Sequence, residues 1–290
     1  MGSCNRLNLD DRARILSALV EGNSIRATCR MTGAAKGTVL KLLADVGDAC
    51  GAFLDDTMRG LRCQRIQADE IWSFCSAKQA NVPREKREDP NYGSMWTWVA
   101  IDPDSKLVVS YMLGKRDPFC ARVFIRDLSE RLANRVQLTT DGLNMYVGAV
   151  EEAFGDGIDY AMLIKVYGNE GETWNAETRY SPSVVTSTRS VVVLGDPLEE
   201  HVSTSHVERA NLTMRMGMRR FTRLTNAFSK KALNLDRALA LHFVYYNFAR
   251  KHTSIKTTPA IKAGIAGHVW SLHEIAQLAD DERGVLKASA

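Results

Sequence analysis

The stretch Ile66-Gln67-Ala68-Asp69-Glu70-Ile71-Trp72-Ser73-Phe74 decides the fold class, because it predicts a β-strand with acidic residues at its centre. Two further strands are predicted over residues 95–101 and 106–113. The turn Asp102-Pro103-Asp104-Ser105 joins these two strands as a hairpin. Polar residues 78–93 predict a loop between the first strand and the hairpin. The chain therefore begins a sheet with three antiparallel strands.

The following segment alternates between helix and strand. Apolar spacing predicts a helix over 121–133, a short strand over 136–140, a helix over 142–154 and a strand over 160–166. Three antiparallel strands followed by this alternation are the order of an α/β ribonuclease-H-like domain. We expect that domain over residues 66–262, with a polar, irregular insertion around 168–205, helices resuming from residue 205, and a C-terminal helical tail over 263–290.

The first 50 residues have a different texture and predict three short helices, the last over 36–46. The sequence predicts Ser24 as the N-cap of the second helix and Gly33 as the turn before the third. Helix, glycine turn and helix favour a helix-turn-helix DNA-binding domain over 1–50, joined by a linker over 51–65. Its exposed DNA-facing residues would be Lys36, Thr38 and Lys41. A three-helix packing module without a ligand is the alternative.

Composition sets wider bounds. The chain has 290 residues, 45% of them apolar and 25% charged, and a formal net charge of +4. These values suit a globular protein with a full core and say little about nucleic acid. Six scattered cysteines form no C-x-x-C pair, which argues against a zinc ribbon and favours a reduced, cytoplasmic protein. The absence of a long apolar run or signal core predicts no membrane association.

Three carboxylates are framed as candidate metal ligands. Asp69 and Glu70 are neighbours on one strand, so their side chains point to opposite faces, and spacing does not say which one serves a site. Asp141 follows Leu138-Thr139-Thr140 and precedes Gly142, so it lies at the carboxyl edge of a strand, where α/β folds build sites. An ordinary salt-bridged acid and an Asp-Gly turn are the structural alternatives.

Glu208 opens a basic stretch that ends at Lys231 and contains no further acid. Its seven cations are Arg209, Arg215, Arg219, Arg220, Arg223, Lys230 and Lys231. On a helical wheel, the apolar side chains Val207, Met214, Met218 and Phe221 form one stripe, with Glu208 on the adjoining polar stripe. Carboxylate oxygens are preferred ligands of Mg²⁺ and Mn²⁺, and the cations suit a phosphate backbone. A solvated amphipathic surface helix is the alternative.

Several strings together resemble the DDE transposases of bacterial insertion sequences, most closely the insertion-sequence-one family. The first three contain the acids: Gln67 to Phe74, Leu138 to Gly142, and His206 to Arg215. Basic residues 218–231 and the C-terminal run Phe243-Val244-Tyr245-Tyr246-Asn247-Phe248, with Thr258-Pro259-Ala260, are also similar. The likeness covers nearly the whole chain. Leu143-Asn144 and His206 depart from the family pattern, and the paired-cysteine element of some members is missing.

The resemblance implies a retroviral-integrase-like fold and a transposase that binds insertion-sequence ends in double-stranded DNA. It implies Asp69, Asp141 and Glu208 as catalytic metal ligands, and so favours Asp69 over Glu70. The cofactor would be Mg²⁺ or Mn²⁺, with two ions supporting DNA cleavage and strand transfer. It further implies DNA recombination by a mobile element, a homo-oligomer on DNA, and a bacterial protein associated with the nucleoid.

Two other functions remain open from the sequence. His206-Val207-Glu208-Arg209 with Tyr245 or Tyr246 further on is the residue order of a tyrosine recombinase, which would use a covalent nucleophile without metal. That function gives Asp69 and Asp141 no role. A non-catalytic helix-turn-helix regulator is the other alternative, and it needs no converging acids.

Overall fold

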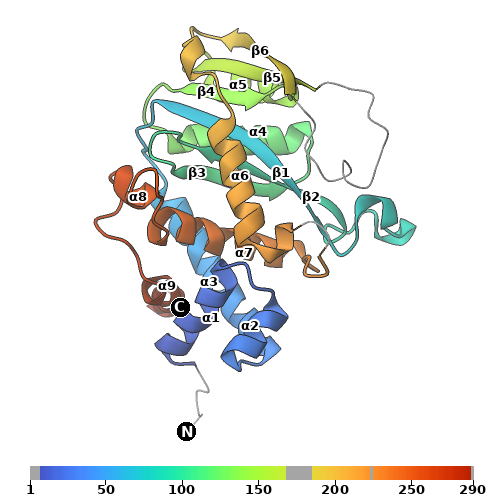
Figure 1. Cartoon of the computed structure of the whole chain (residues 1–290), viewed down its shortest axis with the longest axis vertical. Helices are drawn as coiled ribbons and strands as arrows, with labels where there is room; N and C mark the ends of the chain where they lie inside the picture. Colours follow the sequence, from blue (N-terminus) through green and yellow to red (C-terminus); the bar gives the residue numbers. More distant parts are fainter. Residues whose placement is uncertain (1–6, 168–184, 223–224, 289–290) are drawn as a thin grey trace.

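A six-stranded sheet organises the larger part of the molecule (Figure 1). The computed structural model describes residues 7–167, 185–222 and 225–288. The strand order is β3-β2-β1-β4-β5-β6. Strand β2 pairs in antiparallel fashion with both β1 and β3. Strand β4 is parallel to its two neighbours, β1 and β5, and β6 is antiparallel to β5. The strands are β1 (Arg65–Cys75), β2 (Gly93–Ile101), β3 (Val108–Gly114), β4 (Gln137–Asp141), β5 (Asp159–Tyr167) and β6 (Val185–Leu194).

The hairpin between β2 and β3 follows from its turn chemistry. The Asp102 carboxylate accepts hydrogen bonds from the backbone N–H groups of Asp104, at 2.9 Å, and Ser105, at 3.2 Å. Such side-chain-to-backbone bonds close Asp turns. Lys106 has a positive φ of 66° and cannot continue a strand, so β3 begins at Val108, two residues later than the sequence predicts.

Helices cover both faces of the sheet. Helices α4 (Pro118–Arg131) and α5 (Met145–Phe154) lie on one face, where Trp98 of β2 contacts Phe124 and Tyr146. Helix α6 (Ser205–Gly217) crosses the other face and packs on β1 and β2 (Figure 1). The predicted apolar stripe of this helix is confirmed, because Val207, Met214, Met218 and Phe221 are all buried. The helix itself stops at Gly217, and a 3₁₀ turn, Arg219–Phe221, follows.

Three helices form at the N-terminus as predicted: α1 (Leu9–Val20), α2 (Ile25–Thr32) and α3 (Lys36–Thr57). The Ser24 hydroxyl caps α2 by accepting the Ala27 N–H at 3.1 Å, and Gly33 ends it in the left-handed region with φ 75°. The predicted end of the third helix was wrong, since α3 runs 22 residues and takes in the start of the expected linker. Its second half packs against α7 (Ala232–Val244) and α9 (Leu272–Ala288).

The α3–α7 contact explains that length. A Cβ at Gly47 would lie 2.6 Å from the Arg237 Cβ, so only glycine allows the two helices to approach so closely. Glycine lowers helix propensity, and the burial of Val46, Cys50 and Leu54 compensates. Buried residues of α1 and α3 belong to the same hydrophobic cluster as those of the sheet. The N-terminal helices therefore share a core with the rest of the molecule.

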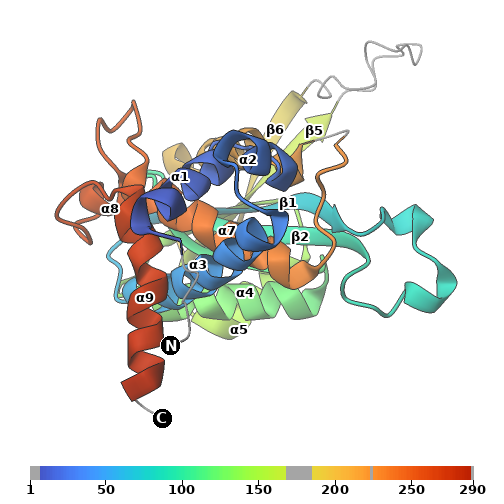
Figure 2. The same cartoon turned by 90° about the horizontal axis from the view of Figure 1, so that it is seen from below.

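Two segments towards the C-terminus complete the fold. The expectation of an irregular segment over 168–205 was partly wrong, because residues 185–194 form the edge strand β6; residues 168–184 lie outside the described residues. The polar run Thr186 to Ser190 and the apolar run Val191 to Leu194 give β6 no apolar alternation of the kind that sequence patterns detect. Beyond α7, a π-helical turn (Tyr245–Ala249) and the short α8 (Pro259–Lys262) lead to α9, which lies beside α1 and α3 (Figure 2). Within the described ranges, no helix combines the length and apolar character needed to cross a membrane.

Candidate active site

The pairing of β1 with β4 brings Asp69 and Asp141 together. Ala68 pairs with Thr140 in the parallel ladder, so the residue after each of them is an aspartate. Asp69 lies within β1, whereas Asp141 is the last residue of β4. The Asp141 carboxylate also accepts the Leu143 N–H at 3.0 Å, which fixes its side chain at the strand end. Two acids far apart in sequence thus become neighbours through sheet register alone.

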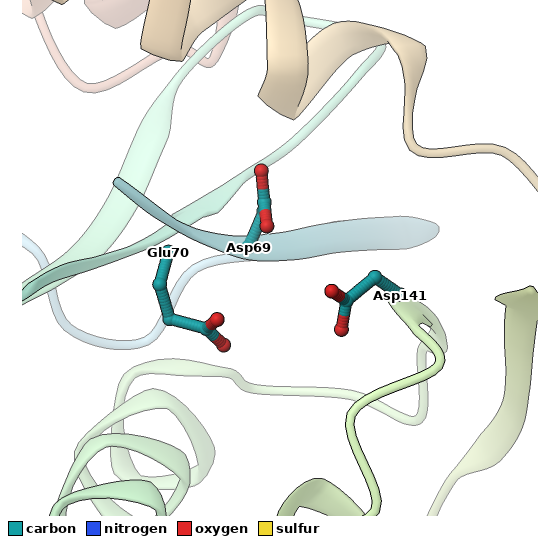
Figure 3. A group of neighbouring side chains, drawn as sticks. All are labelled: Asp69, Glu70 and Asp141. Carbon is teal, nitrogen blue, oxygen red and sulfur yellow. The ribbon is translucent and has the colours of Figure 1, made fainter. Parts of the chain in front are cut away.

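Glu70 joins this pair. Asp69, Glu70 and Asp141 each offer a carboxylate oxygen, and these oxygens all lie within 4.8 Å of one another. We call these three residues the carboxylate group. Figure 3 shows Asp69 and Glu70 on opposite sides of β1, with Asp141 turned toward the space between them. The alternation of side chains therefore does not exclude Glu70, because the acid on the neighbouring strand lies within reach of both faces.

Arg116 is a member of the site that the sequence did not reveal. Its Nε lies 3.1 Å from Glu70 Oε2, and its Nη2 lies 3.8 Å from Asp141 Oδ2. The residue follows the end of β3, and only the register of β3, β2 and β1 brings it to the acids. No local sequence pattern distinguishes an arginine that follows a strand as a member of a site. In the folded chain, Arg116 supplies positive charge beside two of the three carboxylates.

Burial and mutual repulsion raise the pKa values of the group. The pKa of Asp69 is raised to about 6, chiefly by burial, with further contributions from the charges of Asp141 and Glu208. The pKa of Glu70 is raised to about 7, again chiefly by burial, with contributions from Asp141 and Asp69. Arg116 offsets part of the shift of Glu70. A concentrated negative charge of this kind favours a bound cation.

Helix α6 is attached to β1 next to Asp69. The buried Gln67 side chain accepts the N–H groups of His206, at 2.9 Å, and Val207, at 3.2 Å, at the start of the helix. Two turns into the helix, Asn211 Nδ2 donates to Asp69 Oδ2 at 2.9 Å. Gln67 and Asp69 point to the same face of β1, because they are two residues apart. These bonds set the position of α6 relative to the carboxylate group.

Glu208 lies on this helix but takes other partners. Its Oε1 accepts the Thr204 hydroxyl at 2.6 Å and pairs with Lys165 of β5. The side chain is exposed, and among the described residues it does not belong to the group whose oxygens lie within 4.8 Å. Its charge nonetheless contributes to the raised pKa of Asp69. The structure thus places Glu208 near Asp69 while leaving its role as a ligand a prediction.

The predicted DNA-binding cations are spread over several surfaces. Lys36 and Lys41 of α3 are exposed, with Lys41 paired to Asp45 at 3.2 Å, and Thr38 is half-buried. Of the basic stretch, four side chains are exposed, namely Arg209, Arg219, Lys230 and Lys231. Arg215 and Arg220 are half-buried, and Arg220 donates to the Ser229 hydroxyl at 2.6 Å. Arg223 lies outside the described residues.

The donor set suits Mg²⁺ or Mn²⁺. Three carboxylates from two adjacent strands supply the hard oxygen ligands that these ions prefer. Asn211 adds a buried amide oxygen that lacks a hydrogen-bond partner, while its amide nitrogen holds Asp69. A buried polar atom without a partner costs free energy, which a bound cation or its water would recover. The residues present therefore fit a divalent metal.

Comparison with known proteins adds little to this geometry. No family model matches the chain, and no curated protein matches it. Among solved structures, the chain is similar to a piggyBac transposase synaptic complex with hairpin DNA, with a TM-score of 0.37 and 9% sequence identity. The alignment covers 100% of this chain and 75% of that one. At that distance the similarity carries no argument about fold or function.

Proposed function

We propose that the protein is a DDE-type transposase that binds insertion-sequence ends and carries out metal-dependent cleavage and strand transfer of DNA. The observation that carries this proposal is the carboxylate group on the adjacent strands β1 and β4, with the Arg116 guanidinium beside Glu70 and Asp141. Burial and mutual repulsion both oppose the ionisation of neighbouring carboxylates, and groups that are perturbed in this way are typical of functional sites. A structural ion pair would not need three acids within 4.8 Å of one another.

The strand order supports a ribonuclease-H-like fold for this catalytic part. Three antiparallel strands are followed by the parallel strands β4 and β5, with α4 and α5 as the connecting helices. This is the order that the sequence pattern predicted. The acids lie on the two central strands, where β1 and β4 are adjacent. Asp141 is the last residue of β4, and the carboxyl ends of strands are where open α/β sheets build their sites.

In the proposed mechanism, Asp69 and Asp141 would hold the metal, and Glu70 or Glu208 would provide a third carboxylate. When bound, the ions would activate water or a DNA 3′-hydroxyl and stabilise the leaving oxygen. Asn211 keeps the Asp69 carboxylate oriented through its 2.9 Å hydrogen bond. Arg116 is placed to neutralise a phosphate that enters beside Glu70 and Asp141. The exposed cations of the basic stretch would hold the backbone without reading sequence.

The geometry disfavours the tyrosine-recombinase alternative. Tyr246 is only 4% exposed, and the Tyr245 hydroxyl donates to Glu21 at 3.0 Å. Burial raises the pKa of both phenols above the ordinary value, which makes them poorer nucleophiles. His206 contacts Lys106 at 3.1 Å, so it already has a partner away from either tyrosine. A non-catalytic regulator would leave the carboxylate group without a reason to form.

The proposal is tested on a plasmid that carries the gene with its native flanking DNA. Incubation of the purified protein with this plasmid and Mg²⁺ or Mn²⁺ should produce cuts at the element ends, and EDTA should abolish the cleavage. Denaturing gels should show no protein bound covalently to DNA. No cleavage with either metal, or a phosphotyrosine adduct formed in EDTA, would overturn the proposal.

A further inference from the structure

A row of half-buried aromatic side chains leads away from the carboxylate group. Trp72 and Phe74 lie on the same side of β1 as Glu70, because residues two apart share a face. Trp96 of β2 is the cross-strand partner of Trp72, so it lies on that side as well. We call these three residues, together with Phe228, the aromatic row. Core aromatics of the sheet, such as Trp98, are by contrast fully buried.

Three rings of the row contact one another in order, Trp72 with Phe74 and Phe74 with Phe228. The ring centroids of Trp72 and Phe74 are 5.7 Å apart with planes inclined by 30°. The next pair, Phe74 and Phe228, is 4.7 Å apart at 35°. The segment before α7 is tied to the end of β1, because Ser76 N–H donates to the Ser229 carbonyl at 2.8 Å. Phe228 is therefore held against Phe74 by backbone hydrogen bonding.

Positive charge lies at both ends of the row. The Arg116 guanidinium lies 4.8 Å from the Trp96 ring and also contacts Glu70 and Asp141. At the far end, Lys230 Nζ lies 3.4 Å from the centroid of the Phe228 ring. One arginine thus connects the row directly to the carboxylate group. Cations over aromatic faces are also the arrangement that attracts a phosphate backbone beside stacked bases.

A cavity opens where the row ends. It has a volume of about 550 Å³ and lies between the end of β1 and the segment before α7. Phe74 and Phe228 form its aromatic wall, and its polar groups include Lys78, Asn81 and Asn226. Amide side chains next to aromatic planes can hydrogen-bond the edges of an unpaired base while the planes stack on its face.

We propose that the aromatic row and its cavity bind unpaired nucleotides of the DNA strand whose phosphate lies at the carboxylate group. Asp69 and Phe74 are five residues apart on one strand, which corresponds to roughly 16 Å at about 3.3 Å per residue. That span accommodates a short run of splayed nucleotides next to the reacting phosphate. The inference rests on the proposed function for its choice of DNA. It adds that part of the duplex is opened beside the site and held by stacking.

Binding of a fluorescein-labelled oligo-dT to the full chain in EDTA tests this inference without any cleavage. The variant Trp72→Leu/Phe74→Leu should lower oligo-dT affinity by about tenfold to a hundredfold, because stacking on an aromatic ring is lost. Affinity for a duplex of the same length should stay within about twofold. The single variant Trp72→Phe keeps an aromatic plane and should retain most oligo-dT affinity.

Trp270→Leu is the matched control, because Trp270 is also half-buried and in contact with two aromatic rings, those of Phe53 and Phe248, but precedes α9. It should leave oligo-dT affinity unchanged. Unchanged affinity in folded Trp72→Leu/Phe74→Leu, or equal losses for oligo-dT and duplex, would overturn the inference. Should the double variant fail to fold, Phe74→Leu alone is compared with Trp72→Phe by the same criteria. Cleavage of the plasmid remains a separate measurement, so failure of the proposed function and failure of this site are distinguishable.

Discussion

Asp69 and Asp141, on the adjacent strands β1 and β4, are held in a different way from Glu208 on helix α6. Asp69 and Asp141 are placed by backbone pairing, since their neighbours Ala68 and Thr140 are partners in the sheet. Glu208 is placed by a helix whose attachment to the sheet depends on the side chains of Gln67 and Asn211. In addition, Lys165 and Thr204 already occupy one of its oxygens.

This difference indicates which carboxylates of the proposed site are already in position before a metal ion binds. The strand-borne aspartates have little freedom, because moving either requires breaking sheet hydrogen bonds. Glu208 can exchange Lys165 for another cation by a rotamer change alone, since it is exposed. We therefore expect the aspartates to form a permanent half of the site and Glu208 to complete it on binding metal or DNA.

The largest expected effect is at the strand-borne half. Asp69→Asn or Asp141→Asn should lower the rate of plasmid cleavage by about a thousandfold or more, because each removes a charged ligand worth several kcal/mol. DNA binding measured in EDTA should change little. A variant that retained near-normal cleavage would remove that aspartate from the proposed ligand set.

The next effect separates Glu208 from Glu70. Glu208→Gln should lower cleavage by about a hundredfold and raise the Mg²⁺ concentration needed for half-maximal rate. Glu70→Gln should cost less than about tenfold, because Arg116 already neutralises part of that carboxylate. Titrations of cleavage rate against Mg²⁺ for both variants decide the matter. The reverse order of losses would make Glu70 the third ligand and leave Glu208 as a partner of Lys165.

A stability measurement tests the electrostatics of the strand-borne half directly. The folded-state pKa of Asp69 is raised from 3.8 to about 6, so its contribution to stability is full below pH 4 and is lost as the pH rises through 6. In EDTA, Asp69→Asn should therefore be more stable than the wild type, by roughly 1 kcal/mol at pH 5 and by roughly 3 kcal/mol at pH 8. Urea unfolding at the two pH values measures this gain. Added Mg²⁺ at pH 8 should stabilise only the wild type, and an equal gain at both pH values would contradict the raised pKa.

The smallest effect concerns the N-terminal helices. Lys36→Ala or Lys41→Ala should weaken duplex binding a few-fold at low salt and reduce the slope of log affinity against log salt by about one. The full chain should be used, because α3 packs against α7 and α9. Lys262→Ala on α8, also an exposed lysine, is the control. Unchanged slopes for both α3 variants would leave these helices with a packing role alone.

Sequence patterns were informative where backbone chemistry is local. The Asp102 turn, the Ser24 cap, the Gly33 turn and the buried stripe of α6 all formed as predicted, because each depends on residues a few positions apart. Asp141 was singled out by its place at a strand end, whereas the choice of Asp69 over Glu70 rested on the resemblance, and the role of both as ligands stays a prediction.

The remaining features depend on contacts that no local pattern encodes. Arg116 reaches the acids through the register of three strands, and the full length of α3 depends on the space that Gly47 leaves for α7. The edge strand β6 is mostly exposed and has no apolar alternation, so its pairing with β5 rather than its sequence pattern defines it. The resemblance favoured Asp69 over Glu70, whereas in the folded chain the carboxylate oxygens of both residues lie within 4.8 Å of one from Asp141.

The contact between the first and last helices has a consequence for synthesis on the ribosome. Arg12 of α1 is buried and makes two hydrogen bonds to Asp280 of α9, 268 residues further on, at 2.9 and 3.0 Å. At about 5–20 residues per second, α1 emerges roughly 13 to 54 s before its partner. During that interval the apolar side of α1 that α9 will cover is open to chaperones and to other nascent chains. The N-terminal helices therefore reach their final packing only after α9 has been synthesised.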